Sequence, residues 1–197
     1  MIKKLPIYQA KITDENLGMT TISFVDYPAV ESDWLSFDKQ KETVKFSVEN
    51  EEQRIVMGVV MRADYLIYRR TESGYEYYIT YSPDTIRLMA RKYLKDGFQN
   101  NVDLQHDGNL IDGVEMEEIF IKDSENGISP KGFEDISDGS LFARFKVVND
   151  DVWNEIKEGK YNGFSLEGYF EVEEQDPEQQ EFNEIMELIN KINNKLK

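Results

Sequence analysis

The sequence predicts a mainly β fold, in which a β-barrel or a highly curved sheet carries two or three helices around it. Many short strand-like runs are separated by turn residues, and only a few segments have helical periodicity. Strands and helices do not alternate regularly, which argues against a parallel α/β sheet. The 197 residues suffice for one domain with a real core and an appendage.

The first strands lie in the N-terminal third. Short strand-like runs occupy residues 1–30, and "TTISFVDYPAV" alternates well enough to form a strand that ends at Asp26. Pro28 then closes it. Residues 31–53 are polar with scattered aromatics, which predicts a long loop.

The next segment predicts a buried strand and a hairpin. Residues 54–62 form a near-continuous apolar run, as expected of a strand buried on both faces. Residues 65–70 and 75–81 flank "TESG", which has the composition of a hairpin turn.

The clearest helix is predicted over residues 82–97. Ser82 can cap its start, Pro83 suits its first turn, and Gly97 suits its exit. Helical spacing places five apolar residues on one face: Ile86, Met89, Ala90, Tyr93 and Leu94.

Four strand-like runs and a second helix follow. The runs are residues 101–108, 114–124, 139–148 and 163–173. The helix is predicted over residues 149–159, with Asn149 or Asp150 as its cap. Its inward face has Val152, Trp153 and Ile156, and Gly159 ends it.

The pattern changes after Pro177, and we therefore divide the chain at residue 173. Residues 1–173 form the predicted β domain, and residues 174–197 an acidic linker with an amphipathic helix. The helix has a 3-4-3-4 apolar stripe of Phe182, Ile185, Ile189, Ile192 and Leu196. Two alternatives stay open: the helix docks on its own domain, or it associates with another chain.

Composition excludes several classes of function. The net charge of −16 argues against a nucleic-acid groove and disfavours anionic membranes. The chain has no cysteine, which rules out disulfides and thiolate chemistry, and no segment of transmembrane length. It has no signal-peptide pattern, and we expect no cofactor and no metal. The single histidine, His106, means that chemistry requiring imidazole must use this residue.

A serine between two glycines is the candidate nucleophile. In "YNGFSLEGYF", Ser165 lies in a strand-like run between Gly163 and Gly168, where glycine often marks a bend or a close backbone approach. A serine hydroxyl needs a neighbouring base, usually an imidazole, to attack a carbonyl, and the one imidazole of this chain is His106. The spacing alone favours the alternative, an incidental serine and histidine such as most proteins contain.

The third member of such a site must be a carboxylate, because no second histidine exists. Glu115, Glu117 and Glu118 follow His106 in "VEMEEIFI". Strand alternation places Glu117 on a face with two isoleucines, which predicts a partly buried carboxylate that needs a partner. The alternative is a solvated or salt-bridged glutamate, paired with Lys122 or Arg144.

Other sites fit the sequence less well. The acidic stretch 107–118 lacks the calcium-loop pattern, because Ile111 and Asp112 occupy its fifth and sixth positions. Nothing singles out two carboxylates for glycoside hydrolysis, and no glycine-rich phosphate loop is present.

An ordered set of motifs resembles one known family. These are "LQHDG", "VEMEEIFI", "VWNEIKEG" and "GFSLEGYF", preceded by "ISFVDYPAVESDWLSF". Together they resemble the phage prohead maturation proteases, in particular the phage serine protease branch, over roughly residues 5–172. This family is similar in fold to the herpesvirus assemblins, which implies an assemblin-like β-barrel surrounded by helices.

The resemblance also implies roles for individual residues. Ser165 matches the nucleophile, His106 the general base and Glu117 the acidic third member, with Glu115 as the alternative. Assemblins use a second histidine as third member and an arginine after the serine strand, and this chain has neither.

The implied function is a serine endopeptidase of the prohead protease type. Its substrates would be phage scaffold and major capsid proteins, cleaved in the host cytoplasm inside the assembling prohead. The resemblance allows a homo-oligomer and implies no nucleic acid and no membrane. The alternative is a catalytically inactive capsid-assembly or scaffold-binding protein with the same fold.

Overall fold

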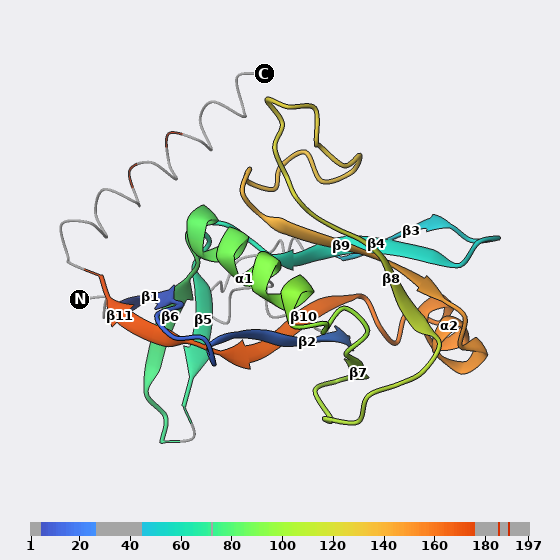
Figure 1. The fold of residues 1–197 in the computed structure, drawn as a ribbon, viewed down its shortest axis with the longest axis horizontal. Coiled ribbons are helices and arrows are strands. Elements are labelled where there is room, and N and C mark those ends of the chain that lie inside the picture. Colours follow the sequence, from blue (N-terminus) through green and yellow to red (C-terminus); the bar gives the residue numbers. More distant parts are fainter. Residues whose placement is uncertain (1–4, 27–44, 72, 176–184, 186–188, 190–197) are drawn as a thin grey trace, which may run out of the picture.

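The computed structural model describes residues 5–26, 45–71, 73–175, 185 and 189 (Figure 1). The two helices are α1 (Pro83–Lys95) and α2 (Asp150–Lys157). The strands are β1 (Ile7–Lys11), β2 (Gly18–Val25), β3 (Ser47–Asn50), β4 (Ile55–Met61), β5 (Ile67–Arg70), β6 (Glu76–Thr80), β7 (Val102–Leu104), β8 (Val114–Ile121), β9 (Leu141–Val147), β10 (Gly163–Tyr169) and β11 (Glu171–Glu174).

The described strands form three sheets, with the orders β11-β1-β6-β5, β10-β2-β7 and β3-β4-β9-β8. Most neighbouring pairs are antiparallel, whereas β1–β6 and β2–β7 are parallel. The mainly β fold with flanking helices is thus confirmed. The closed barrel is not found in the described part of the chain, because β10 lies beside β4 without a hydrogen-bonded ladder between them.

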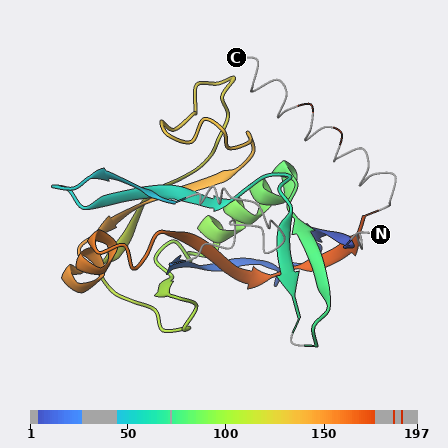
Figure 2. The same ribbon diagram turned by 180° about the vertical axis from the view of Figure 1, so that it is seen from behind.

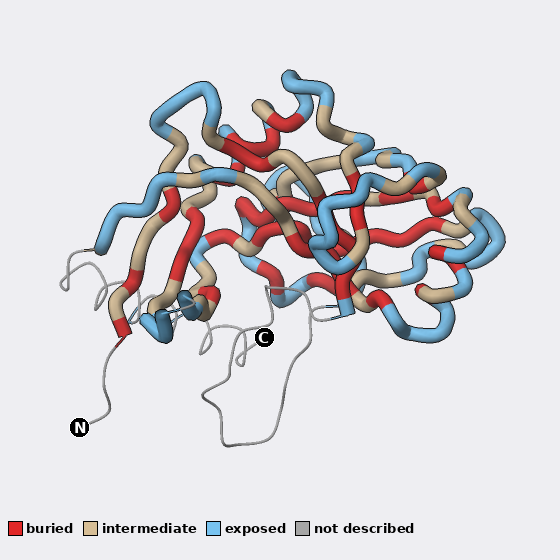
Figure 3. Tube along the Cα trace, turned by 90° about the horizontal axis from the view of Figure 1, so that it is seen from below, coloured by how far each residue is buried: buried red, intermediate tan, exposed pale blue. Residues whose placement is uncertain are grey.

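The core lies between the β10-β2-β7 sheet and the β3-β4-β9-β8 sheet, with α1 covering β2 (Figures 1 and 2). The buried stretches meet in the middle of the molecule (Figure 3). There Phe24 of β2 packs on Phe145 of β9 and Phe164 of β10, with ring centroids 5.4 and 5.0 Å away. Every residue of β4 is buried, as its apolar run predicts.

Helix α1 forms as its sequence predicts. The Ser82 hydroxyl accepts a hydrogen bond from the Thr85 amide at 3.2 Å, and Pro83 occupies the first turn. Four of the five predicted apolar residues are buried, namely Ile86, Met89, Ala90 and Tyr93. Leu94 is the exception, with 47% of its surface exposed.

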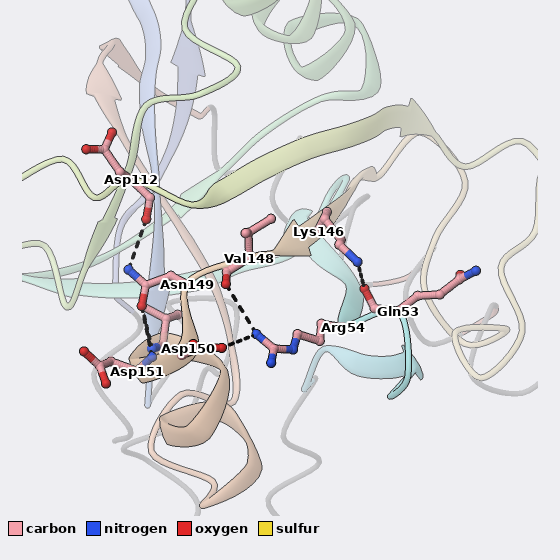
Figure 4. Close-up of polar contacts among 9 residues, drawn as sticks. Gln53, Arg54, Asp112, Lys146, Val148, Asn149, Asp150 and Asp151 are labelled. Carbon is pink, nitrogen blue, oxygen red and sulfur yellow. Dashed lines mark hydrogen bonds and ion pairs between the residues drawn. The ribbon is translucent and has the colours of Figure 1, made fainter.

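Helix α2 is anchored at its N-terminus to the start of β4 (Figure 4). The Asn149 side chain accepts from the amides of Asp151 and Val152, each at 3.1 Å, so Asn149 is the cap. The guanidinium of Arg54 donates to the Val148 carbonyl at 3.3 Å and to the Asp150 carboxylate at 2.6 Å. These contacts connect two segments that are far apart in the sequence.

Three predicted boundaries differ from the structure. Strand β3 lies inside the predicted loop 31–53 and pairs with β4. The predicted strand 101–108 is only β7, because a tight turn follows Leu104. The predicted last strand is two strands, since the chain leaves β2 at Tyr169 and β11 pairs with β1 in another sheet.

The division of the chain at residue 173 stays a prediction. Strand β11 runs to Glu174, so the ordered β structure passes this boundary by one residue. Most of the predicted C-terminal helix lies outside the described residues. Ile185 and Ile189 are described, and both are helical with exposed side chains.

No helix within the described ranges is long and apolar enough to cross a membrane. Over the same residues, no three histidine or acidic side chains converge in a way that could hold a metal ion.

We expect Tyr93→Phe to stabilise the protein. Tyr93 is fully buried, and its hydroxyl has no hydrogen-bond partner among the described residues, which costs about 1–3 kcal/mol. Phenylalanine removes this hydroxyl and keeps the ring. The free energy of unfolding, measured by urea denaturation near neutral pH, should rise by about 1 kcal/mol.

The same substitution should change the stability at alkaline pH. Burial raises the pKa of Tyr93 above its ordinary value of 10.0, so the folded protein keeps this proton when the unfolded chain loses it. Stability from Tyr93 is therefore complete below pH 10.0 and is lost as the pH rises further. Tyr93→Phe should lose less stability between pH 9 and 11 than wild type, and an equal loss would contradict this.

Candidate active site

A row of buried polar side chains crosses the β10-β2-β7 sheet. The register pairs Ser165 with Ser23, and Ser23 with Asp103. Directly opposed residues share one face of a sheet, with Cβ atoms about 5 Å apart. Ser23 and Asp103 are fully buried and Ser165 is 4% exposed, so the row is largely withdrawn from water.

The turn after β7 places His106 over this row. Gln105 and His106 both have positive φ angles, 56° and 58°, which non-glycine residues seldom adopt. The Gln105 amide donates to the Phe24 carbonyl at 3.0 Å, and the Gly108 amide donates to the Asp103 carboxylate at 3.1 Å. Strain of this kind persists only where the surroundings enforce it, and it clusters at functional sites.

The imidazole of His106 contacts two oxygens through one nitrogen. Its Nδ1 lies 2.8 Å from the Ser23 hydroxyl and 2.8 Å from Oε1 of Glu167. An ionised carboxylate only accepts hydrogen bonds, so we assign the proton to Nδ1, from which both oxygens can accept. In the neutral ring, Nε2 then carries the lone pair and is the basic atom.

Glu167 reaches His106 because it lies two residues after Ser165 on the same face of β10. The register between β10 and β2 shifts immediately afterwards, at Glu167/Gly168. A Cβ atom on Gly168 would lie 2.2 Å from the Gly18 carbonyl oxygen, so only glycine permits this approach of two backbones. Glycine is therefore needed at position 168, where the bulge brings the backbones of β10 and β2 together.

Ser165 shares a sheet face with Ser23, the partner of His106, but does not hydrogen-bond to the imidazole itself. The Ser165 hydroxyl has no hydrogen-bond partner in the described part of the chain, and Ser23 lies between it and the imidazole. The two candidate residues are therefore brought to one face of one sheet. A hydrogen bond that is absent in a free enzyme can still form when substrate binds.

The carboxylate that contacts His106 is Glu167, whereas Glu117 lies in a different sheet. Strand β8 has a register shift between Met116 and Glu118, which breaks the alternation on which the predicted burial of Glu117 rested. Glu117 is exposed, and its carboxylate lies 3.6 Å from Nε of Arg144. This is the salt-bridged alternative that the sequence left open.

Glu115 does not approach His106 either. It is exposed on β8, opposite Lys146 of β9. Arg144 already serves three acidic side chains, since Glu49 and Glu118 lie 2.9 and 3.5 Å from its guanidinium. The acidic segment after His106 thus forms a surface ion-pair cluster.

Three comparisons relate the chain to known proteins. The sequence model of a family described as "Putative phage serine protease XkdF" matches residues 43–174, a range that includes His106, Ser165 and Glu167. The chain is 29% identical over 191 residues to "Uncharacterized protein YqbD" of Bacillus subtilis (strain 168). This alignment covers 91% of the chain and 53% of that protein, so the chain spans about half the length of this relative. No solved structure matches the chain.

We expect Gly168→Ala to destabilise the protein and to disturb the contact between Glu167 and His106. The added methyl group would overlap backbone atoms of Gly18 and Met19, and overpacking of this kind costs about 1–3 kcal/mol. Gly97→Ala is a suitable control, because Gly97 has a positive φ but open space around it. Urea denaturation should show a loss of about 1 kcal/mol or less for the control. Equal losses would contradict the close-approach argument.

Proposed function

We propose that the chain, which belongs to the phage serine protease XkdF family, is a serine endopeptidase of prohead maturation. Its substrates would be scaffold and capsid proteins, cleaved within the assembling head in the host cytoplasm. The observation that carries this proposal is the contact of the His106 imidazole with the Glu167 carboxylate, on the sheet face that holds Ser165.

The proposed roles follow from the hydrogen bonds. Ser165 is the nucleophile, and Nε2 of His106 is the general base. Glu167 accepts from Nδ1, which keeps the basic lone pair on Nε2 and stabilises the imidazolium that forms during the reaction. Ser23 contacts the same nitrogen and helps to fix the plane of the ring. Glu167 thus takes the role that the family resemblance suggests for Glu117.

The proposed reaction is acyl transfer in two stages. Ser165 Oγ forms a bond to the carbonyl carbon of the scissile peptide while its proton passes to Nε2 of His106. The tetrahedral oxyanion collapses, the C–N bond breaks, and His106 returns the proton to the leaving amine. A water molecule then gives a proton to His106 and attacks the acyl-enzyme, and His106 returns this proton to Ser165 Oγ as the acyl C–O bond breaks and the acid leaves.

The buried setting supports this chemistry. Ser23 and Asp103 have no exposed surface, which limits water around the imidazole and strengthens electrostatic interactions there. The Asp103 carboxylate holds the Gly108 amide and so fixes the turn that carries His106. The imidazole itself keeps 36% of its side chain exposed, so a substrate has access to it.

The first experiment compares the two serines. Wild type, Ser165→Ala and Ser23→Ala are each co-expressed with the scaffold and capsid proteins of the same phage or prophage, and the products are measured by intact mass. We expect defined fragments from wild type, none from Ser165→Ala, and cleavage slowed about tenfold or more in Ser23→Ala, because a partner of the imidazole is lost. Cleavage by Ser165→Ala but not by Ser23→Ala would make Ser23 the nucleophile.

Full-length partners in all three samples would instead support an inactive assembly module, if the proteins still bind one another. The strands that carry the family motifs fit that alternative equally well, since a binding protein can keep the fold of a protease without its catalytic activity.

A second prediction tests whether Glu167 or Glu117 is the acidic partner of His106. Glu167→Gln should lower kcat by about 10²–10⁴-fold, because a neutral amide can donate to Nδ1 and favour the wrong imidazole tautomer. Glu117→Gln changes a similar side chain but only removes an exposed ion pair with Arg144, so its activity should stay close to wild type. The reverse result would restore the role suggested for Glu117 by the resemblance.

A further inference from the structure

A small open depression lies beside Ser165, where β10 meets β4 and β5 without forming a ladder. The room inside it is only about 10 Å³, enough for one water molecule, so a ligand side chain would lie across its open mouth. The lining residues are Val60, Met61, Ile67, Arg69, Tyr81, Phe164, Ser165 and Leu166. Five of these are apolar, and besides Ser165 two of them, Arg69 and Tyr81, carry side-chain hydrogen-bond donors.

Arg69 has no acidic partner among the residues that the structure describes. It is half-buried on β5, and the described residues give its guanidinium one hydrogen bond, from Nη1 to the Tyr68 carbonyl at 3.1 Å. No carboxylate among those residues pairs with it, although the protein has a net charge of −16 and other arginines do pair. A guanidinium that pairs with no carboxylate of the described residues is free to bind an anion, and Arg69 lines the depression beside the proposed nucleophile.

Tyr81 provides a second donor. Only 3% of it is exposed. Burial raises the pKa of its phenol, while the positive charge of Arg69 acts in the opposite direction. The phenol therefore stays protonated near neutral pH, and the guanidinium is close enough to act on it. The two groups offer N–H and O–H donors to one ligand.

We propose that this depression binds an acidic side chain of the substrate, glutamate or aspartate, at a position adjacent to the scissile bond. The inference rests on the proposed peptidase function and specifies its substrate class. Arg69 would pair with the carboxylate, and Tyr81 would donate to one of its oxygens. The apolar residues would contact the methylene groups of the substrate side chain, and Ser165 would lie next to the adjoining carbonyl.

The main test is cleavage of a randomised peptide library, with the cleavage sites read by mass spectrometry. For wild type, we expect glutamate or aspartate to be enriched at one fixed position next to the cleaved bond. Peptides with glutamate there should be cleaved with a kcat/KM about 10–100-fold higher than matched glutamine peptides, as expected for a hydrogen-bonded charge.

Three variants show which residue carries the preference. Arg69→Met should abolish the discrimination between glutamate and glutamine, and Arg69→Glu should favour lysine or arginine instead. Arg70→Met is the matched control, because Arg70 is the next residue of β5 and its exposed side chain points to the other face. It should keep the wild-type preference.

Two outcomes would overturn the inference while the peptidase function stands. One is cleavage by wild type without an acidic preference. The other is an equal loss of kcat by Arg69→Met on all peptides with the preference unchanged, which would assign Arg69 to the reacting oxyanion instead.

A binding experiment covers the case in which no peptide is cleaved. The ¹⁵N-labelled Ser165→Ala protein is titrated with N-acetyl-glutamate N-methylamide or with the matching glutamine compound. We expect the amide chemical shifts of β5 and β10 to change with the glutamate compound only. In the double variant Ser165→Ala/Arg69→Met, neither compound should change them. Shifts without cleavage would support the acidic subsite and contradict the peptidase. Equal responses to both compounds, or none, would reject the subsite.

Discussion

The hydrogen bond between Nδ1 of His106 and the Glu167 carboxylate is the contact on which the site depends, because the chain has one imidazole. It joins the turn after β7 to strand β10, about sixty residues later in the sequence. Strand β2 lies between them and fixes the distance, since it pairs with both strands. Strand β2 is therefore part of the candidate site, although the family match begins only at residue 43.

The site also requires polar groups to be buried in a sheet. Ser23 and Asp103 are fully buried, and Oδ1 of Asp103 has no hydrogen-bond partner among the described residues. An unsatisfied buried group costs about 1–3 kcal/mol, and the positive φ angles of Gln105 and His106 add strain. Packing of Phe24, Phe145 and Phe164 on the other side of these strands offsets such costs.

Much of the local structure could be predicted from the sequence. Helix α1 with its Ser82 cap, the buried strand β4 and the hairpin of β5 and β6 follow from local patterns, and each was confirmed. Local patterns could not decide between a closed barrel and separate sheets. Closure depends on hydrogen bonds between the backbones of β10 and β4, and side-chain patterns do not encode these. The division of the predicted strand 163–173 into β10 and β11 depends on the pairing of β11 with β1, which lies at the other end of the chain.

The residues of the candidate site were likewise predictable only where local strand alternation determines their position. Glu167 could have been found from the sequence, because two residues after Ser165 is the same face of a strand. Regular alternation along β8 favours Glu117 instead, but the register shift between Met116 and Glu118 breaks that alternation. Ser23 and Asp103 could not be predicted, since only the register of three strands brings them beside His106.

The tautomer of His106 tests this account most directly, and the chain is well suited to the measurement because it has one histidine. Selective ¹⁵N labelling of histidine gives one pair of ring signals, which can be recorded near pH 8, where an ordinary imidazole is neutral. We predict a protonated Nδ1 and an unprotonated Nε2 in the wild-type protein. In Glu167→Gln, the Nδ1 proton should become less populated. A wild-type ring protonated on Nε2 would contradict the assignment of Nε2 as the base.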